Sequence, residues 1–203
     1  MSTKFLLKFK SSRSLSENIW PTRKITPKQK FILLKMRKKK LSNFGLKLQA
    51  KRALSILYGK LSSNQYNKTR EEASKLQGKI GNNFISCLEK RLDTVIYRMN
   101  ICPTFRSAKQ LILHEKIFVN SKLVNIPSFQ LKPGDIISIS PNNQANFLSL
   151  LEKSSNLWKH NRVCKTKSLH LEINYKTLNA VFLYPPQQLF NSYQLDINLL
   201  TQE

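Results

Sequence analysis

Apolar side chains recur at three- and four-residue steps through the middle of the chain, and the clearest run comprises Phe84, Leu88, Leu92, Val95, Ile96 and Met99. This spacing places the whole set on one face of an α-helix. Asn82 or Asn83, just before the run, is typical of a helix N-cap. The pattern therefore predicts one unbroken amphipathic helix that ends near Met99.

Further helices are predicted before this one. Residues 44–58 have helical periodicity, and Gly59 directly afterwards is a suitable left-handed stop. Ser62 or Ser63 then offers an N-cap for a helix that ends near Gln77. Consecutive helices with such short joints indicate a small α-helical domain.

A short break follows the amphipathic helix. Pro103 disfavours helical geometry at the residue before it. Asn100 occupies a position where we expect a positive φ angle, which Asn tolerates better than most residues. Thr104 then caps a helix that runs to about His114. The chain thus predicts a pair of helices joined by a tight turn.

Short β-rich segments follow this helix pair. Strands are expected at residues 117–119, 123–126, 136–139, 169–174 and 180–184. The predicted turn between the first two strands is Asn120-Ser121-Lys122. Residues 142–156 have helical spacing instead, and residues 196–198 favour a terminal helical turn.

The N-terminal residues 1–40 lack sustained periodicity. We expect an extended basic arm there, with a helical turn at residues 31–36. Such a segment buries too little apolar surface to fold alone. It would become ordered only against a partner.

The charge of the chain indicates a polyanionic partner. Lys and Arg number 35 against 11 Asp and Glu, which gives a formal net charge of +24. Self-repulsion of this size favours binding to nucleic acid. The excess is uneven, because residues 1–60 hold 17 basic side chains and one acid, Glu17, whereas no basic residue follows Lys176. We expect the front of the chain to contact phosphate and the tail to contact protein.

Residues that usually mark a cofactor, a metal site or catalysis form no recognisable pattern. The cysteines, at positions 87, 102 and 164, include no Cys-x-x-Cys pair, which disfavours zinc and disulfides and favours a reducing compartment. The histidines lack ligand spacing, and the 5 glycines provide no phosphate-cradling loop. Residues 31–34, the longest apolar run near the N-terminus, are too short to span a bilayer. The sequence therefore predicts no cofactor, no metal, no membrane partner and no small-molecule substrate.

Several short segments together carry a family resemblance that none carries alone. In chain order they are Lys40–Gly45, Tyr58-Gly59, Arg91–Met99, Ala108–Ile112 with His114, Val119-Asn120, Val124–Ser128, Asp135–Ile139 and Asp196–Asn198. Their order and spacing resemble the bacterial-type small-subunit ribosomal protein four family, in an organellar version. We expect the mitochondrion, with the plastid as the alternative, because plastid relatives usually stay closer to the bacterial pattern.

The resemblance implies an α+β fold in which a small helical domain is interrupted by an inserted RNA-binding domain. The inserted domain would pack a two-helix motif, within residues 91–140, on a small and mainly antiparallel β-sheet. The expected boundaries are a basic N-terminal arm at residues 1–40, a helical rRNA-binding domain at residues 41–86 completed by residues 177–203, and the inserted RNA-binding domain at residues 87–176.

The implied function is that of a structural constituent of the small ribosomal subunit, without enzymatic activity. The resemblance implies binding to the 5′ region of small-subunit rRNA early in assembly, and contacts with neighbouring ribosomal proteins, notably small-subunit protein five. It also implies a place near the mRNA entry channel and a contribution to translational accuracy. Two departures stand out. The arm lacks the zinc-binding cysteine cluster of many bacterial relatives, and Phe105 stands where relatives usually carry Arg.

We expect RNA contacts from basic residues of the helical domain and of the two-helix motif, because each phosphate that a cation neutralises releases condensed counterions. The predicted contact residues are Lys38, Lys39, Lys40, Lys47, Lys51, Arg52, Arg91, Arg98, Thr104, Phe105, Arg106, Lys109, His114, Lys116 and Lys122. For any single lysine, a solvated surface position is as strong an expectation as a contact. Phe105 is a candidate for stacking on a base, whereas Tyr97 and Phe118 are expected in the core.

The sequence Arg91-Leu92-Asp93 allows a different interpretation. Pseudouridine synthases use an Arg-Leu-Asp sequence around a catalytic aspartate, and several carry the same RNA-binding module. Here the sequence falls inside the predicted long helix, and no room is left for a catalytic domain. We therefore expect Asp93 to form an ion pair with a nearby basic residue. An RNA-modifying enzyme, or a ribosome-associated RNA-binding factor, is the alternative function.

Overall fold

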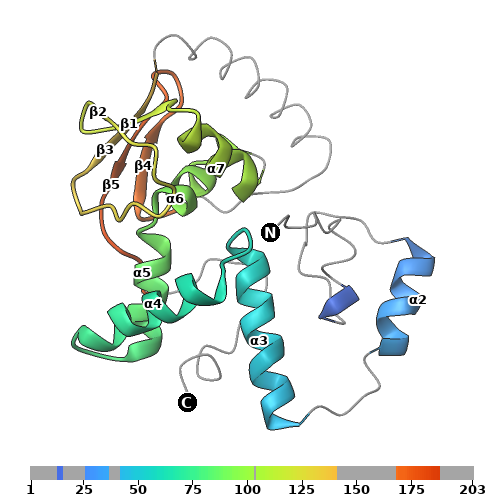
Figure 1. The fold of residues 1–203 in the computed structure, drawn as a ribbon. Helices are drawn as coiled ribbons and strands as arrows, with labels where there is room; N and C mark the ends of the chain where they lie inside the picture. Colours follow the sequence, from blue (N-terminus) through green and yellow to red (C-terminus); the bar gives the residue numbers. More distant parts are fainter. Residues whose placement is uncertain (1–12, 16–25, 37–41, 103, 141–167, 188–203) are drawn as a thin grey trace. The chain divides into compact units, whose positions relative to one another are not determined.

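The chain folds into two compact units, the first extending through Tyr66 and the second beginning at Asn67 (Figure 1). Helices make up the first unit, and the second combines helices with an antiparallel sheet. The α+β prediction is thus confirmed. The computed structural model describes residues 13–15, 26–36, 42–102, 104–140 and 168–187. The predicted helix at residues 142–156 and the terminal turn at residues 196–198 lie outside these ranges.

Helix α2 (Pro27–Met36) of the first unit is longer than the single turn expected in the arm. Its start is a capping box, in which the Gln29 backbone N–H donates to Thr26 Oγ1 at 3.4 Å and the Thr26 N–H donates to Gln29 Oε1 at 3.3 Å. This reciprocal cap satisfies two backbone donors. It explains a ten-residue helix where apolar periodicity alone indicated only a turn.

The next helix, α3 (Asn43–Leu57), closely matches its prediction. Ser42 caps its start by accepting a hydrogen bond from the Gly45 N–H at 3.2 Å. Gly59 follows with a φ of 68°, the left-handed conformation expected of a helix stop. The helix buries Ala53, Leu54 and Leu57 in the first unit.

Helix α4 (Ser63–Lys75) carries the boundary between the units and is also capped at both ends. Ser62 and Gln65 form a second capping box, with N···O distances of 3.2 and 3.3 Å. Gly78 follows with a φ of +110°. The prediction that Asn82 or Asn83 caps the next helix is wrong. The Asn83 amide instead donates to carbonyls at the end of α4 and just after it, those of Ala73, Leu76 and Gln77.

The predicted long helix is interrupted, which corrects the expectation of an unbroken run to Met99. Helix α5 (Ile80–Glu89) ends, Arg91 adopts an extended conformation with a ψ of 137°, and α6 (Leu92–Arg98) begins. At the break, the Leu92 N–H donates to the Phe129 carbonyl at 2.9 Å. Apolar periodicity reports which side of the chain is buried. It does not report that backbone hydrogen bonds from a distant segment replace the helical ones.

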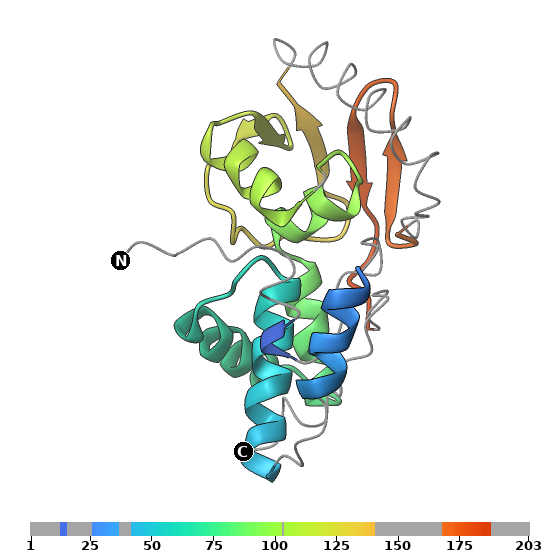
Figure 2. The same ribbon diagram turned by 90° about the vertical axis from the view of Figure 1, so that its right-hand side faces the viewer.

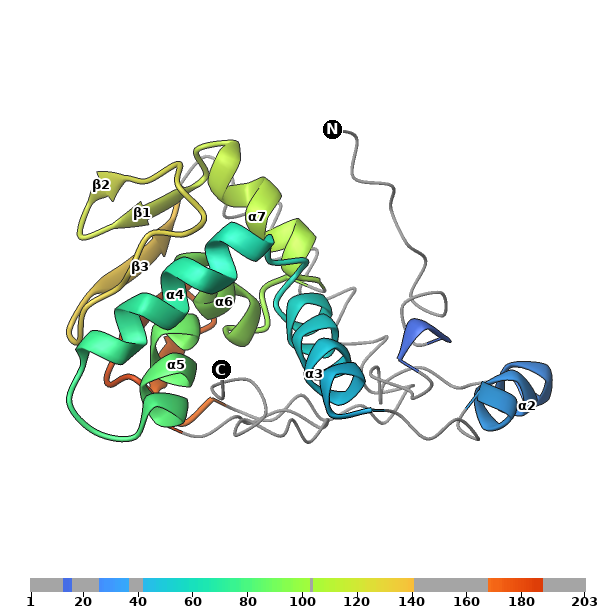
Figure 3. The same ribbon diagram turned by 60° about the horizontal axis from the view of Figure 1, so that its bottom comes forward.

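The second unit contains a five-stranded antiparallel sheet in the order β2-β1-β3-β5-β4. Its strands are β1 (Ile117–Val119), β2 (Lys122–Leu123), β3 (Ile136–Ile139), β4 (Leu171–Asn174) and β5 (Asn179–Phe182). Figure 3 shows the β1–β2 hairpin beside β3, and β2 is an edge strand of the sheet. Strand β5 pairs with β3 and β4. The second unit therefore includes β5 as well as the other four strands. The domain boundaries expected at residues 87 and 176 remain predictions.

The β1–β2 hairpin is tighter and shorter than predicted. Its two-residue turn is Asn120-Ser121, with φ angles of 49° and 64°, as a type I′ turn requires. The return strand ends at Leu123 instead of continuing to Ile126. After a last bond from the Val124 N–H to the Ile117 carbonyl, the chain leaves the sheet, and residues 127–131 bond instead to the backbone around Arg91.

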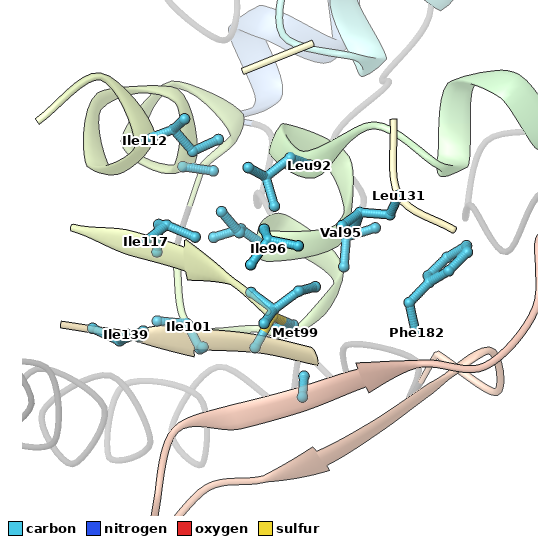
Figure 4. Close-up of a cluster of buried hydrophobic side chains, with 14 of the residues drawn as sticks. Leu92, Val95, Ile96, Met99, Ile101, Ile112, Ile117, Leu131, Ile139 and Phe182 are labelled. Atoms are coloured by element: carbon cyan, nitrogen blue, oxygen red, sulfur yellow. The ribbon is translucent and has the colours of Figure 1, made fainter. Parts of the chain in front are cut away.

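The core of the second unit lies between the sheet and two helices, α6 and α7 (Phe105–Leu113). Both helices cover the same face of the sheet (Figure 2). In the close-up, Ile96 and Met99 from α6, Ile112 from α7 and Ile117 and Ile139 from the strands gather in one cluster (Figure 4). This packing holds α6 and α7 in fixed positions on the sheet. Within the described ranges, no helix is both long and apolar enough to cross a membrane.

Candidate nucleic-acid interface

The joint between α6 and α7 is built from a positive-φ residue, a cap and a stacked pair of rings. Asn100 has a φ of 61°, as predicted, and Thr104 Oγ1 accepts a hydrogen bond from the Ser107 N–H at 3.2 Å. The Phe105 ring lies 3.9 Å from the Tyr97 ring at an interplanar angle of 25°. Only 7% of Phe105 is exposed, so its ring is part of the joint. Burial raises the pKa of Tyr97.

A buried ion pair lies at the start of α6. Arg91 Nε and Nη2 donate to the two carboxylate oxygens of Asp93 at 3.1 and 2.8 Å. The two side chains are 4% and 1% exposed. Thr94 Oγ1 donates to the same carboxylate at 3.3 Å. The expected ion pair of Asp93 is therefore confirmed.

Lys109 of α7 joins this group from the neighbouring helix. Its Nζ lies 3.7 Å from Asp93 Oδ2, and the side chain is 23% exposed. Burial of the ammonium group lowers the pKa of Lys109, and the Asp93 carboxylate opposes that shift. Asp93 thus faces cations from both helices, and it ties the outer helix, α7, to the start of α6.

A second buried ion pair lies at the end of α6. Arg98 Nη2 and Nε donate to the carboxylate of Glu89 at 2.7 and 3.1 Å, and the side chains are 11% and 2% exposed. Ser168 Oγ donates to the Arg98 carbonyl at 3.3 Å, which connects the segment before β4 to α6. Arg98 therefore holds α5, through Glu89, against α6.

The remaining predicted cations of this unit lie at or near the surface. Arg106 and Lys116 are half-buried, whereas His114 and Lys122 are exposed. They come from α7, the turn after it and the β1–β2 hairpin. With Lys109 they form what we call the α7–hairpin surface, defined by Arg106, Lys109, His114, Lys116 and Lys122. The exposed cations of this unit that were not predicted as contacts include Lys132 and Lys176.

Two family models match this chain. The model for the S4 domain matches residues 90–137, which hold α6, α7, β1, β2 and the first half of β3. A second model, for the ribosomal protein S4/S9 N-terminal domain, matches residues 4–89.

Full-length relatives extend the match. Small ribosomal subunit protein uS4m from Marchantia polymorpha is 43% identical over 202 residues, which cover 97% of this chain and 99% of that protein. Small ribosomal subunit protein uS4 from Caulobacter vibrioides is 34% identical over 194 residues, covering 92% and 90%. The protein of that name from Brucella ovis is 42% identical over 146 residues, covering 68% and 70%.

The chain belongs to the uS4 family. Proteins of the uS4 family are structural components and not enzymes, so this chain is not an enzyme. The alternative based on Arg91-Leu92-Asp93 gains no support from the geometry, because Arg91 occupies both oxygens of the Asp93 carboxylate. Within the described ranges, no group of three or more His, Cys, Asp or Glu side chains is placed to hold a metal ion.

The predicted contacts before this module lie on α3 of the uS4 chain. Lys47 and Lys51 are half-buried and Arg52 is exposed. Lys51 Nζ sits 4.4 Å from the centre of the Tyr66 ring, a cation–π contact that holds its head group in place. Lys38, Lys39 and Lys40 lie outside the described residues.

The structure thus separates the predicted residues into two groups. Arg91, Arg98 and Phe105 lie in buried contacts, where they connect helices. The α7–hairpin surface and the α3 cations remain partly or fully accessible. Sequence reasoning missed Glu89, the partner of Arg98. Two features of the sequence could have indicated it. Glu89 is an acid in a strongly basic stretch, and the apolar periodicity places it near the buried face of the helix.

Proposed function

We propose that this chain is a structural constituent of the small subunit of the mitochondrial ribosome, and that it binds small-subunit rRNA through the α7–hairpin surface and the cations of α3. The observation that carries the proposal is a cation-rich surface on α7 and the β1–β2 hairpin, with α7 tied to α6 through buried Asp93, in a uS4-family chain of formal charge +24. The 43% identity with uS4m over 97% of this chain supports the mitochondrion.

Binding works by neutralising phosphates. Each contact releases counterions from the RNA. In a plot of log K against log salt concentration, each phosphate contact therefore makes the slope more negative by about 0.7–0.9. Folded RNA hides its base edges in a deep, narrow major groove. The surface therefore recognises the positions of phosphates, and its own rigidity provides the selectivity.

The residues have different roles in this proposal. Arg106, His114, Lys116 and Lys122 contact phosphates directly, with Lys109 at the edge of the surface. Arg91 and Arg98 act from the interior, where they hold α6 in place. Thr104 and Phe105 shape the joint that sets the direction of α7. Further phosphate contacts come from Lys47, Lys51 and Arg52, and from Lys38, Lys39 and Lys40 of the arm.

The family resemblance also supports finer proposals about partners. We place the chain beside small-subunit protein five, near the channel through which mRNA enters, where it contributes to translational accuracy. The segment after Lys176 contains no cation, which suits contact with protein better than contact with RNA.

Chemical footprinting tests the central proposal. The purified full-length protein should protect a junction in the 5′ region of small-subunit rRNA, and a transfer RNA transcript should compete weakly. Equal binding to both RNAs would remove the proposal. Sedimentation in high salt separates a ribosomal constituent, which stays with the particle, from a loosely associated factor, which is washed off.

A further inference from the structure

Helix α3 presents two faces of different character. One face is buried in the first unit through Ala53, Leu54 and Leu57. The other carries residues spaced at i, i+3, i+4, i+7 and i+8, which share one side of a helix: Phe44, Lys47, Leu48, Lys51 and Arg52. We call this the outer α3 face.

An unusually exposed aromatic side chain stands at the start of the outer α3 face. Phe44 is 75% exposed, the highest value among the large apolar residues of the described chain. Leu48, one turn later, is 36% exposed. Ser42 fixes this end of the helix through its bond to the Gly45 N–H. Phe44 is therefore held outward on an ordered helix, with no burial in its own unit to account for it.

The surroundings of Phe44 decide which kind of partner covers it. No Asp or Glu occurs from residue 18 to residue 70, so every charged residue near Phe44 in the sequence is basic. Lys47 and Arg52 share its face, and Arg52 lies about 12 Å further along the helix axis. An apolar ring on the same helix face as cations suits a ligand that has both a flat apolar surface and negative charge. Among macromolecules, a nucleic acid strand with an unpaired base has both.

We propose that Phe44 stacks on an unpaired base of small-subunit rRNA, while Lys47 and Arg52 bind phosphates of the same strand. This inference rests on the proposed function, since it adds a base contact to an rRNA-binding helix. Every base has a π face, so the contact requires an unstacked nucleotide and no particular base. Leu48 packs beside the ring and excludes water from one edge of the stack.

Binding of the full-length protein to a transcript of the 5′ region of small-subunit rRNA tests the inference. Phe44→Ala should weaken binding by about 5- to 140-fold, the usual range for one base stacked on an aromatic ring. The salt dependence should not change, because no charge is removed. Phe44→Leu should weaken binding similarly, and Phe44→Trp should preserve it. Arg52→Ala should instead lower the salt slope by about 0.7–0.9.

The inference and the proposed function fail in different ways. If the wild-type protein does not prefer this transcript to a transfer RNA transcript, the proposed function fails. If the wild-type protein shows that preference and Phe44→Ala binds as tightly, only the stacking contact is refuted. Phe44→Leu binding as tightly as wild type would also refute it, because an apolar contact without a ring would then suffice. Tyr175→Ala, which removes an exposed aromatic from the β4–β5 turn, is the matched control and should bind normally.

Discussion

Asp93 shows how a single buried acid organises a basic surface. Its carboxylate is 1% exposed and accepts two hydrogen bonds from Arg91, and Lys109 approaches it from α7. A buried charge is tolerated only where a partner compensates for the lost hydration. In a chain with three times as many basic as acidic residues, this acid serves to hold cations of two helices in place.

Removal of the Asp93 carboxylate should destabilise the fold. Asp93→Ala leaves the Arg91 charge buried without a counterion, which typically costs about 3–5 kcal/mol. Urea unfolding followed by circular dichroism measures the loss. Glu172→Ala, at an exposed carboxylate on β4, is the control and should change stability by less than about 0.5 kcal/mol. Equal stability of the two variants would contradict the role given to Asp93.

Stability should also depend on His170. The side chain is 1% exposed, packs against the rings of Phe182 and Tyr184, and has no hydrogen-bond partner for either ring nitrogen in the described part of the chain. Burial lowers its pKa below 6.5. As the pH falls below 6.5, the unfolded chain therefore takes up a proton that the folded chain resists, and the free energy of unfolding decreases until the pH passes the folded pKa.

Unfolding curves between pH 5 and pH 7.5 measure this effect. His170→Phe should flatten the dependence on pH in this range. A wild-type stability that is constant from pH 7.5 to pH 5 would contradict the burial of a neutral His170.

At the scale of elements, the features of the fold that could be predicted were those that depend on residues close together in the sequence. Gly59, Asn100 and Thr104 marked turns and caps that the structure contains, because φ preferences and capping bonds depend on near neighbours. The break at Arg91 was not predictable in this way. It depends on backbone bonds from residues 127–131, about 40 residues further along. The same holds for the candidate site. The sequence shows where the basic residues are, but it does not show which of them lie in buried ion pairs.

The β1–β2 turn offers a test of local backbone strain. Ser121 has a φ of 64°, a conformation that costs an ordinary L-residue about 1–2 kcal/mol. Ser121→Gly should raise the free energy of unfolding by about 0.5–1 kcal/mol, after allowance for the greater freedom of glycine in the unfolded chain. Thermal or urea unfolding measures the gain. Ser128→Gly, in an exposed loop without positive φ, should bring no gain, and equal gains at both positions would contradict the strain.

At the scale of the whole molecule, charge and fold have separate tasks. The formal charge of +24 supplies long-range attraction to RNA but no geometry. Geometry comes from the compact second unit, whose apolar core fixes the helices that carry the cations. Charge alone would bind any polyanion, and the fold restricts binding to RNA of matching shape.

The salt dependence of rRNA binding should reflect this division. If roughly 10 cations engage phosphates at once, log K should fall against log salt with a slope of about −7 to −9. Arg106→Ala should make that slope less steep by about 0.7–0.9. Lys176→Ala, in the turn beside β4 at the sheet edge opposite the hairpin, should leave the slope unchanged. Filter binding at several potassium chloride concentrations measures the slope for the wild-type protein and the two variants. An unchanged slope for Arg106→Ala would exclude that side chain from the interface.

The bonds at the Arg91 break have a consequence for the order of events during synthesis. The first amides of α6 find their acceptors in Pro127 and Phe129, which leave the translating ribosome well after α6 does. Until then α6 can form as a continuation of α5, without the fixed start at which Asp93 ties α7 to α6. The nascent chain should therefore gain its ability to engage RNA in one late step, once the segment through Leu131 has emerged and docked.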